Sequence, residues 1–299
     1  MKIGFIGLGI MGKPMSKNLL KAGYELVVCG HKAKGPVEEL VGLGAKAAAT
    51  PKDVAEQSDI VITMLPNSPQ VKEVVLGDNG IIKGAKRGTI VVDMSSIAPL
   101  VSRELASKLA ETGVEMLDAP VSGGEPKAIA GTLAIMVGGR QEVFDKCYPV
   151  LKTMGASVVQ TGDIGAGSVT KLANQVIVAL NIAAMSEALV LATKAGVSPD
   201  VVYQAIRGGL AGSAVLDAKA PLIMDRKFKS NFRIDYHMKD LGNALETARE
   251  IGAPLPLTAS VFEMMQALNG ENLSDTDHCV LVQFYEKLAK VEVLPHGQT

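Results

Sequence analysis

Cysteine is scarce in this chain. Three residues, Cys29, Cys147 and Cys279, occur among 299. They are odd in number and far apart, whereas a disulfide framework needs paired cysteines. This pattern favours reduced thiols and predicts a cytoplasmic protein.

An excess of either charge is also missing. The 30 basic and 31 acidic residues give a net charge of −1, and lysine and arginine form no block longer than a few residues. Proteins that hold nucleic acid or anionic membranes by electrostatics carry a basic patch, so we expect neither partner here. Hydrophobic residues at 47% and charged residues at 20% are typical of a globular chain, and the length favours two domains over one.

Neither a leader nor a membrane span is expected. The first strand begins at residue 2, in the segment MKIGFIGLG, which leaves no room for a signal or transit peptide. One long apolar stretch runs from Leu172 to Thr193. Polar residues interrupt this stretch at Asn174, Gln175, Asn181, Ser186 and Glu187. Because a bilayer penalises such groups, we interpret the stretch as a buried helix.

The first half of the chain alternates between short β-branched runs and amphipathic stretches. The runs, predicted as buried parallel strands, span residues 2–6, 25–29, 59–65, 89–94 and 115–120. The stretches predicted as helices span 11–22, 35–43, 51–57, 68–75 and 99–112. Further strands are expected at 132–139 and 157–162, with a helix at 141–153. This alternation predicts an α/β fold, a doubly wound parallel sheet with helices on both faces.

The pattern changes after residue 162. Only helical patterns follow, at about 165–195, 198–208, 211–222, 235–251, 256–269 and 275–290. Residues typical of helix starts and ends flank them, namely Ser198 with Pro199, Ser274 or Asp275, Gly196 and Gly252. We therefore predict an α/β domain over 1–162 and an all-helical domain over 163–299.

The helix expected from residue 165 is apolar on most of its circumference. An apolar helix needs cover on all sides. We expect a second subunit to supply part of that cover, which predicts a homodimer or homotetramer formed through the helical domain.

The segment GLGIMG follows the first strand and opens the first helix. Its glycines Gly7, Gly9 and Gly12 have the spacing of a dinucleotide-binding loop. Gly7 permits a tight turn, Gly9 lets the backbone approach the pyrophosphate, and Gly12 lets the helix pack closely on the strand. Ile10 and Met11 lie within the same loop, where the helix dipole faces the phosphates. An ordinary glycine-rich turn is the alternative, but the strand–loop–helix context favours a cofactor site.

Two further segments end neighbouring strands. MLPNS, residues 64–68, and DMSS, residues 93–96, come at the carboxyl ends where ligands of such sheets bind. Leu65, Pro66 and Ser96 would each be ordinary loop residues when taken singly. As a set at successive strand ends, they favour a cofactor cleft.

DAPVSGG, residues 118–124, ends the next strand. Ser122 offers a hydroxyl, and Gly123 and Gly124 offer unhindered backbone N–H groups, which suits a small anion such as a carboxylate. A plain strand-to-helix turn explains these residues equally well.

GAGSVTKLANQ, residues 165–175, places Lys171 one helical turn before Asn174 and Gln175. A lysine in an apolar helix is costly to bury as an unpaired ion, so it is neutral, paired or faces a cleft, where it could transfer protons. A boundary lysine that extends to solvent is the alternative. Lys239 and Asp240 form a second pair that chemistry alone favours as a surface pair.

Other kinds of site find little support. DTDH, residues 275–278, holds possible metal ligands, but no further cluster completes a metal site, and Asp275 and Asp277 suit a helix N-terminus better. No Ser-His-Asp arrangement, nucleophile elbow or phosphate loop occurs. We therefore expect no metal.

The end of the second strand determines the choice of dinucleotide. An NAD site usually has a carboxylate there for the ribose 2′-OH, but Gly30 takes that position, followed by His31, Lys32 and Lys34. Without the acid, and with positive charge nearby, a 2′-phosphate is attracted. This favours NADP(H), while a solvated basic loop in an enzyme that also accepts NAD(H) is the alternative.

Three motifs, FIGLGIMGKPMSKNL, DAPVSGG and GSVTKLANQ, resemble in order and spacing those of the β-hydroxyacid dehydrogenases, and the resemblance covers essentially the whole chain. It implies a Rossmann domain, an all-helical C-terminal domain and an oligomer built on the long helix. It also implies an NAD(P)-dependent enzyme that reduces a short semialdehyde acid to a hydroxy acid. A cofactor-binding regulator without chemistry is the alternative, disfavoured because Ser122, Lys171 and Asn174 are all intact.

The resemblance assigns roles to the residues found above. Lys171 matches the family's catalytic lysine, and Asn174 matches the asparagine of the lysine motif. Ser122, Gly123 and Gly124 match the loop that holds the substrate carboxylate. Lys239 matches a lysine that closes over cofactor and substrate, which reverses its interpretation as a surface residue. The family often has asparagine where this chain has Gln175.

Overall fold

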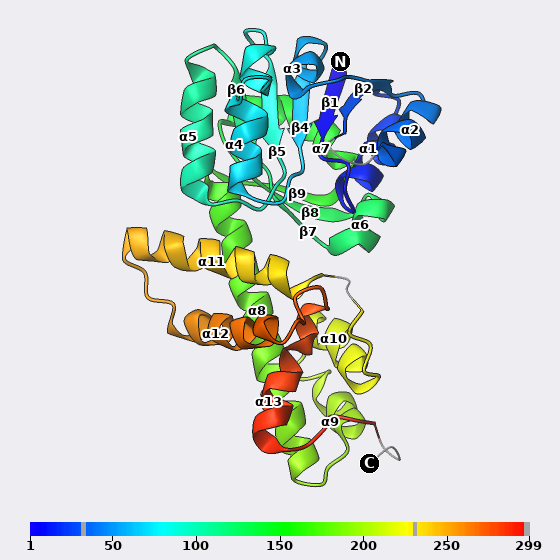
Figure 1. Cartoon of the computed structure of the whole chain (residues 1–299), viewed down its shortest axis with the longest axis vertical. Coiled ribbons are helices and arrows are strands. Elements are labelled where there is room, and N and C mark those ends of the chain that lie inside the picture. The colour runs from blue at the N-terminus through cyan, green and yellow to red at the C-terminus, as the bar shows by residue number, and fades with distance from the viewer. Residues whose placement is uncertain (31–33, 230–231, 296–299) are drawn as a thin grey trace. The chain divides into compact units, whose positions relative to one another are not determined.

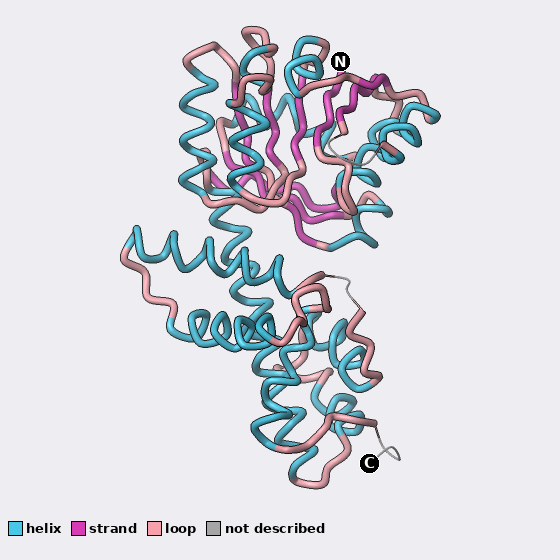
Figure 2. Tube along the Cα trace, in the orientation of Figure 1, coloured by secondary structure: helices cyan, strands magenta, loops and turns pink. Residues whose placement is uncertain are grey.

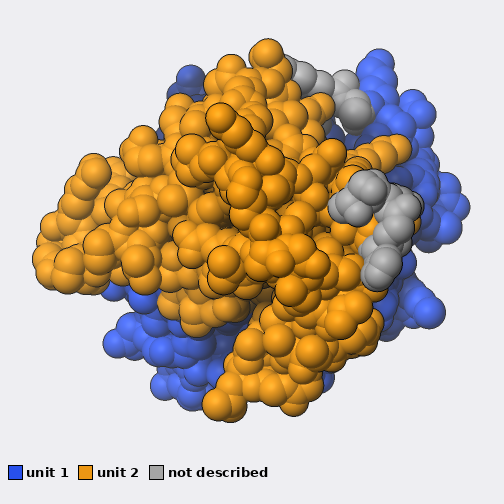
Figure 3. Space-filling view, turned by 90° about the horizontal axis from the view of Figure 1, so that it is seen from below, with its two compact units in different colours: residues 1–171 blue, residues 172–299 orange. Residues whose placement is uncertain are grey.

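The computed structural model of the chain describes residues 1–30, 34–229 and 232–295. It divides into two compact units, residues 1–171 and 172–299, coloured separately in Figure 3. Figure 2 shows that the strands of the large sheet lie in the first unit and that helices build the second.

The first unit contains a nine-stranded sheet (Figure 1). Its strands are β1 Lys2–Ile6, β2 Glu25–Cys29, β3 Lys46–Ala47, β4 Ile60–Thr63, β5 Ile90–Asp93, β6 Glu115–Asp118, β7 Val121–Ser122, β8 Leu133–Gly138 and β9 Gly155–Gly162. The spatial order is β3-β2-β1-β4-β5-β6-β8-β7, with β9 paired to β8. The first six strands are parallel neighbours, while β8 runs antiparallel to β6 and β7.

The strand order reverses direction at β1. The chain goes from β1 outward to β2 on one side and returns to β4 on the other. In doubly wound sheets the crevice for a ligand opens at such a point, beyond the carboxyl ends of the strands. The fold therefore indicates a binding site beside the loops that follow β1 and β4.

Helices cover both faces of this sheet. One core holds α1 Gly12–Lys21, α2 Gly35–Gly42, α6 Gly124–Ala130 and α7 Gln141–Lys152, and the other holds α3 Pro51–Glu56, α4 Ser68–Leu76 and α5 Pro99–Ala110 with the 3₁₀ turn Ile81–Lys83. Neighbouring strand residues alternate between the two cores: Phe5 belongs to the first and Ile6 to the second. Runs rich in β-branched residues, such as IVIT and IVVD, are buried on both sides for this reason.

Local sequence chemistry sets the start of α3. Thr50 accepts a hydrogen bond from the backbone N–H of Asp53 at 3.1 Å, and the Asp53 carboxylate accepts one from the N–H of Thr50 at 3.0 Å. Pro51 occupies the first turn, where its missing N–H costs nothing. This reciprocal pair is a capping box, which fixes the helix start.

The second unit is helical. Its elements are most of α8 Ala166–Lys194, then α9 Pro199–Ile206, α10 Ala214–Met224, α11 Ile234–Ile251, α12 Pro256–Gly270, the 3₁₀ turn His278–Leu281 and α13 Val282–Ala289. Ile182 and Leu189 of α8 pack with Leu241 of α11 and Met265 of α12 in one core. The division between the units falls inside α8, between Lys171 and Leu172.

Helix α8 is long and apolar enough, by length and composition alone, to cross a membrane: its most apolar window has a mean hydropathy of 2.0. In this structure 39% of that window is buried. The buried part packs in the core of the second unit, whereas Ile177 and Leu191 are 61% and 72% exposed. The described residues of this chain alone therefore do not bury all of the apolar surface of α8.

The structure departs from the predicted elements at several places. Strands β3 and β7, of two residues each, are too short for a periodicity to reveal. The helix expected at 275–290 begins as a 3₁₀ turn at His278. Its cap is Asp277, whose side chain accepts from the N–H of Cys279, so capping by Ser274 or Asp275 is wrong. Gly252 does end α11, in the left-handed conformation.

Candidate active site

The glycine loop after β1 is tightly packed on one side and open on another. A Cβ at Gly12 would lie 1.8 Å from the carbonyl oxygen of Gly7, and a Cβ at Gly7 would lie 2.2 Å from that of Met64. Among the described residues, no atom lies within 4 Å of a Cβ built at Gly9. Gly7 also has φ +101°, which favours glycine. The loop therefore fits a pyrophosphate approaching at Gly9, with α1 starting at Gly12.

The loops after β4 and β5 are tied together beside that glycine loop. The Thr63 hydroxyl donates to Asp93 Oδ1 at 2.8 Å, the N–H of Ser95 donates to the same oxygen at 3.2 Å, and the N–H of Leu65 donates to Ser95 Oγ at 2.8 Å. Leu65 is half-buried. Asp93 thus organises two of the loops in which we predict cofactor residues.

Pro66 and Ser96 lie at the surface of the same two loops. Pro66 is exposed, and Ser96 is half-buried. Ile10, in the glycine loop, is 69% exposed, and Met11 beside it is half-buried.

The Asp93 carboxyl is unusual electrostatically. Burial raises its pKa from 3.8 to about 6, against the opposing effect of the hydrogen bonds from Ser95 and Thr63, and the nearby Asp118 raises it further. Within the described ranges, Asp93 Oδ2 has no hydrogen-bond partner. Burial likewise raises the pKa of Asp118, and hydrogen bonds from the N–H groups of Ser168 and Gly165 oppose that rise.

The predicted carboxylate loop follows β6 and the short β7. Ser122 is half-buried and pairs with Ala134 of β8, which fixes its backbone. Gly123 and Gly124 have φ of +137° and +69°, conformations that residues with a Cβ rarely adopt. The turn therefore requires its two glycines.

Asp118, at the carboxyl end of β6, holds the start of α8. The N–H of Gly165 donates to its Oδ1 at 2.7 Å, and that of Ser168 donates to its Oδ2 at 2.6 Å. Lys171 follows one turn later and is only 7% exposed. This burial agrees with the prediction that Lys171 lies in an apolar helix. Sequence reasoning missed Asp118, although its place at a strand end, inside DAPVSGG, was a usable signal.

In the second unit, four residues named in the sequence analysis, Asn174, Gln175, Lys239 and Asp240, form a chain of contacts. Asn174 donates to Gln175 Oε1 at 2.8 Å, and Gln175 donates to Asp240 Oδ2 at 2.7 Å. Asp240 Oδ1 lies 2.8 Å from Lys239 Nζ, and the Asp240 side chain is 2% exposed. Lys239 and Asp240 are therefore no solvated surface pair. Gln175 links Asn174 to this ion pair.

Two residues expected to choose the dinucleotide, His31 and Lys32, lie outside the described residues. Gly30 directly follows the end of β2, and Lys34 immediately precedes α2. No acidic residue occupies the position after β2.

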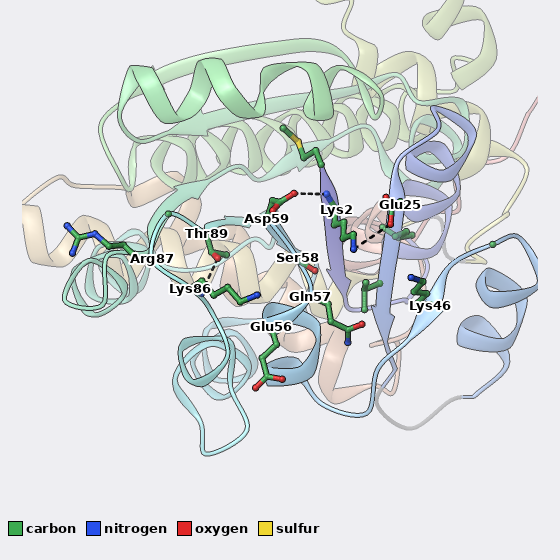
Figure 4. A pocket seen from close by; sticks show the side chains of 15 residues that line it. Lys2, Glu25, Lys46, Glu56, Gln57, Ser58, Asp59, Lys86, Arg87 and Thr89 are labelled. Carbon is green, nitrogen blue, oxygen red and sulfur yellow. Dashed lines mark hydrogen bonds and ion pairs between the residues drawn. The ribbon is translucent and has the colours of Figure 1, made fainter.

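One cavity, of about 730 Å³, lies at the opposite edge of the sheet (Figure 4). Lys2, Glu25, Asp59 and Thr89 line it, at the amino ends of β1, β2, β4 and β5. Charges of both signs face each other there: Lys2 Nζ lies 3.8 Å from Glu25, and the Lys2 N–H donates to Asp59 at 2.8 Å. Since ligands of doubly wound sheets bind at the carboxyl edge, we assign no cofactor to this cavity. Across residues 1–30, 34–229 and 232–295, no group of three potential metal ligands occurs.

The glycine loop at the switch point of the doubly wound sheet fits a dinucleotide, and the comparisons with known proteins identify the class as nicotinamide-dependent oxidoreductases acting on CH–OH groups. Family models agree. One described as the NAD-binding domain of 6-phosphogluconate dehydrogenase matches residues 2–162, and one described as NAD-binding of NADP-dependent 3-hydroxyisobutyrate dehydrogenase matches residues 165–285. The chain belongs to the β-hydroxyacid dehydrogenase family, as its motifs suggest.

Individual relatives are similar over their whole length. The 2-hydroxy-3-oxopropionate reductase of Escherichia coli (strain K12) is 46% identical, with 97% of this chain and 98% of the relative covered. The 2-(hydroxymethyl)glutarate dehydrogenase of Eubacterium barkeri is 40% identical, with 98% and 97% covered. A solved structure of Mycobacterium tuberculosis 3-hydroxyisobutyrate dehydrogenase with L-serine superposes with a TM-score of 0.88 at 30% identity, covering 95% of this chain and 98% of that one.

Proposed function

We propose that this protein reversibly reduces tartronate semialdehyde, 2-hydroxy-3-oxopropanoate, to D-glycerate with NADPH. The observation that carries the proposal is the buried Lys171 at the start of α8, tied through Asp118 to the strand that leads into the carboxylate loop. The similarity to a 2-hydroxy-3-oxopropionate reductase supports the choice of substrate. Such a reaction belongs to glyoxylate metabolism and to glucarate and galactarate catabolism.

The residues of the chain divide the chemistry between them. The bound nicotinamide supplies hydride to the aldehyde carbon. Negative charge then develops on the aldehyde oxygen, and Lys171 Nζ, as ammonium, donates a hydrogen bond and then its proton to that oxygen. In the oxidative direction the neutral amine takes the proton back. Lys171 is thus the general acid and base.

The substrate carboxylate is held by Ser122 Oγ and the backbone N–H groups of Gly123 and Gly124. Fixing this end of the substrate orients the aldehyde for proton transfer and removes much of its rotational freedom before reaction. Asn174 and Lys239 are further proposed substrate-binding residues, and the Gln175–Asp240 contacts support both.

The proposed cofactor site comprises the glycine loop and the neighbouring strand-end loops. The residues of these loops are Gly7, Gly9, Ile10, Met11, Gly12, Gly30, His31, Lys32, Leu65, Pro66 and Ser96. Lys239 and Asp240, both on α11, are further proposed cofactor-binding residues. We favour NADP(H) over NAD(H) because Gly30 stands where an acid would otherwise repel a 2′-phosphate.

A different short hydroxy acid is the second candidate, since the M. tuberculosis structural neighbour is a 3-hydroxyisobutyrate dehydrogenase. Succinic semialdehyde is a third possible substrate of the same chemical class. Tartronate semialdehyde, succinic semialdehyde and methylmalonate semialdehyde, the oxidised form of 3-hydroxyisobutyrate, each offer a carboxylate and an aldehyde, so the proposed residues would serve each of them.

A substrate panel tests the proposal. NADPH and NADH oxidation are measured separately with tartronate semialdehyde, succinic semialdehyde and methylmalonate semialdehyde. We expect the highest kcat/KM with tartronate semialdehyde and NADPH. A higher value with another semialdehyde would reject the substrate, and a tenfold preference for NADH would reject the cofactor.

We further propose that the protein is cytoplasmic, binds neither nucleic acid nor membranes, and forms a homodimer or homotetramer. Support for the oligomer comes from the apolar helix α8, where the side chains of Ile177 and Leu191 are exposed to solvent. A second copy would remove this apolar surface from water.

A further inference from the structure

Asp118 makes an unusual connection between a strand end and a helix start. Both of its carboxylate oxygens accept backbone hydrogen bonds, from Gly165 at 2.7 Å and from Ser168 at 2.6 Å. The first N–H groups of a helix have no partner within the helix, so an acceptor that takes two of them fixes the position of the first turn. The Asp118 side chain is 1% exposed, so water does not compete for these bonds.

The surroundings of this carboxylate leave it little freedom. A Cβ at Gly138 of β8 would lie 2.3 Å from Asp118 Oδ1. A Cβ at Gly167 of α8 would lie 2.4 Å from the Asp118 carbonyl oxygen and 2.5 Å from that of Met136. The first turn of α8 is therefore pressed against the ends of β6 and β8, and glycine is required on both sides of the contact.

The same strand end leads directly to the carboxylate loop. From Asp118 the chain continues through two residues into β7, which contains Ser122. In the other direction, through its two hydrogen bonds, Asp118 holds the turn of α8 that precedes Lys171. One carboxylate thus fixes the spacing between the proposed substrate-holding loop and the proposed proton donor, all within the first unit.

We propose that Asp118 is a positioning residue for proton transfer by Lys171, acting by holding the first turn of α8 on the end of β6. This proposal rests on the proposed function, because it takes Lys171 as the proton donor. Asparagine cannot replace the aspartate, because its NH₂ group would face one of the two N–H donors and only one oxygen would remain to accept.

A double-mutant cycle tests the proposal. The variants are Asp118→Asn, Lys171→Ala and the double variant. The matched control is Ser102→Ala, which removes a different buried side-chain contact to the same turn, that between Ser102 Oγ and Ser168 Oγ at 3.1 Å. For each variant, kcat and KM are measured with tartronate semialdehyde. NADPH affinity and circular dichroism report whether the protein is folded.

We expect Asp118→Asn to lower kcat on the order of 10²-fold, since misplacing a reacting group by about 1 Å has that effect. NADPH affinity should stay within about threefold of wild type, as should every parameter of Ser102→Ala. In the Lys171→Ala background, Asp118→Asn should cost no more than about threefold further, because a residue that acts through the lysine has nothing left to position.

Full kcat in Asp118→Asn, or losses that multiply in the double variant, would overturn the proposal. If Lys171→Ala alone keeps normal turnover, the proposed function fails instead, so the two failures are distinguishable. Should Asp118→Asn not fold, Asp118→Ser, which is smaller, takes its place with the same expectation. Failure of both variants to fold would mean that Asp118 serves the fold as a whole, which also overturns the proposal.

Discussion

The buried carboxyl of Asp93 predicts a specific dependence of stability on pH. Its pKa rises from 3.8 to about 6 in the folded protein, mainly through burial. Between these values the folded state binds a proton that the unfolded chain has lost, so the free energy of unfolding falls as pH rises through this window. A difference of about two pKa units corresponds to about 3 kcal/mol. Below pH 3.8 and above about pH 6, the Asp93 carboxyl adds nothing further to the change of unfolding free energy with pH.

Asp93→Asn removes the titration but keeps an oxygen that can accept from Thr63 and Ser95. The free energy of unfolding would be measured in urea by circular dichroism from pH 4 to pH 8. Relative to the variant, the wild-type protein should lose about 2–3 kcal/mol across this range, most of it below pH 7. Asp78→Asn, at an exposed aspartate, is the control and should run parallel to wild type.

Parallel pH curves for wild type and Asp93→Asn would refute this reasoning. Such a result would mean that Asp93 keeps an ordinary carboxyl pKa despite its burial and its position near Asp118.

Two further predictions concern the glycine loop and helix α8. Gly12→Ala should lower the free energy of unfolding by about 1–3 kcal/mol and weaken NADPH binding, because its Cβ would lie 1.8 Å from the Gly7 oxygen. Gly9→Ala should weaken NADPH binding without loss of stability; equal stability loss in both variants, compared by thermal unfolding and NADPH titration, would contradict the assignment. Leu191→Glu should reduce the molar mass measured by light scattering to that of the monomer, whereas Val41→Glu, in the first unit, should leave it unchanged. A wild-type monomer would reject the oligomer proposal.

The sheet was predictable because its strands are buried on both faces. Runs such as IVIT and IVVD carry this signal in four consecutive residues, and the glycine spacing of GLGIMG identifies the loop that follows the first of the strands. The antiparallel direction of β8 could not be predicted, because an apolar run reads the same in either direction. β7 is held by pairing with β8, so no local pattern reveals it.

Candidate site residues could be picked out from the sequence where a residue's type is rare in its setting. Lys171 stands out because an apolar helix seldom carries a lysine, and it is indeed buried. Asp93 and Asp118 are as chemically conspicuous, but their roles depend on partners far along the chain: Thr63 for Asp93, and Gly165 and Ser168 for Asp118. The link from Asn174 through Gln175 to Asp240 likewise joins two helices that only folding brings together.

Long-range partners also explain the error at the last helix. Asp277 accepts two hydrogen bonds from Lys219 Nζ, each at 2.9 Å, while capping the turn at His278. Nothing near residue 277 in the sequence indicates a partly buried lysine partner from α10. The sequence indicates that Asp277 suits a helix N-terminus, but it predicts Ser274 or Asp275 as the capping residue.

We propose that Lys171 transfers the proton in semialdehyde reduction. The most direct test is kcat for tartronate semialdehyde with NADPH in Lys171→Ala, beside Lys108→Ala as an exposed-lysine control. We expect a loss on the order of 10²–10⁴-fold in Lys171→Ala, with NADPH affinity within about threefold of wild type and full turnover in the control. Turnover in Lys171→Ala within about threefold of wild type would contradict it.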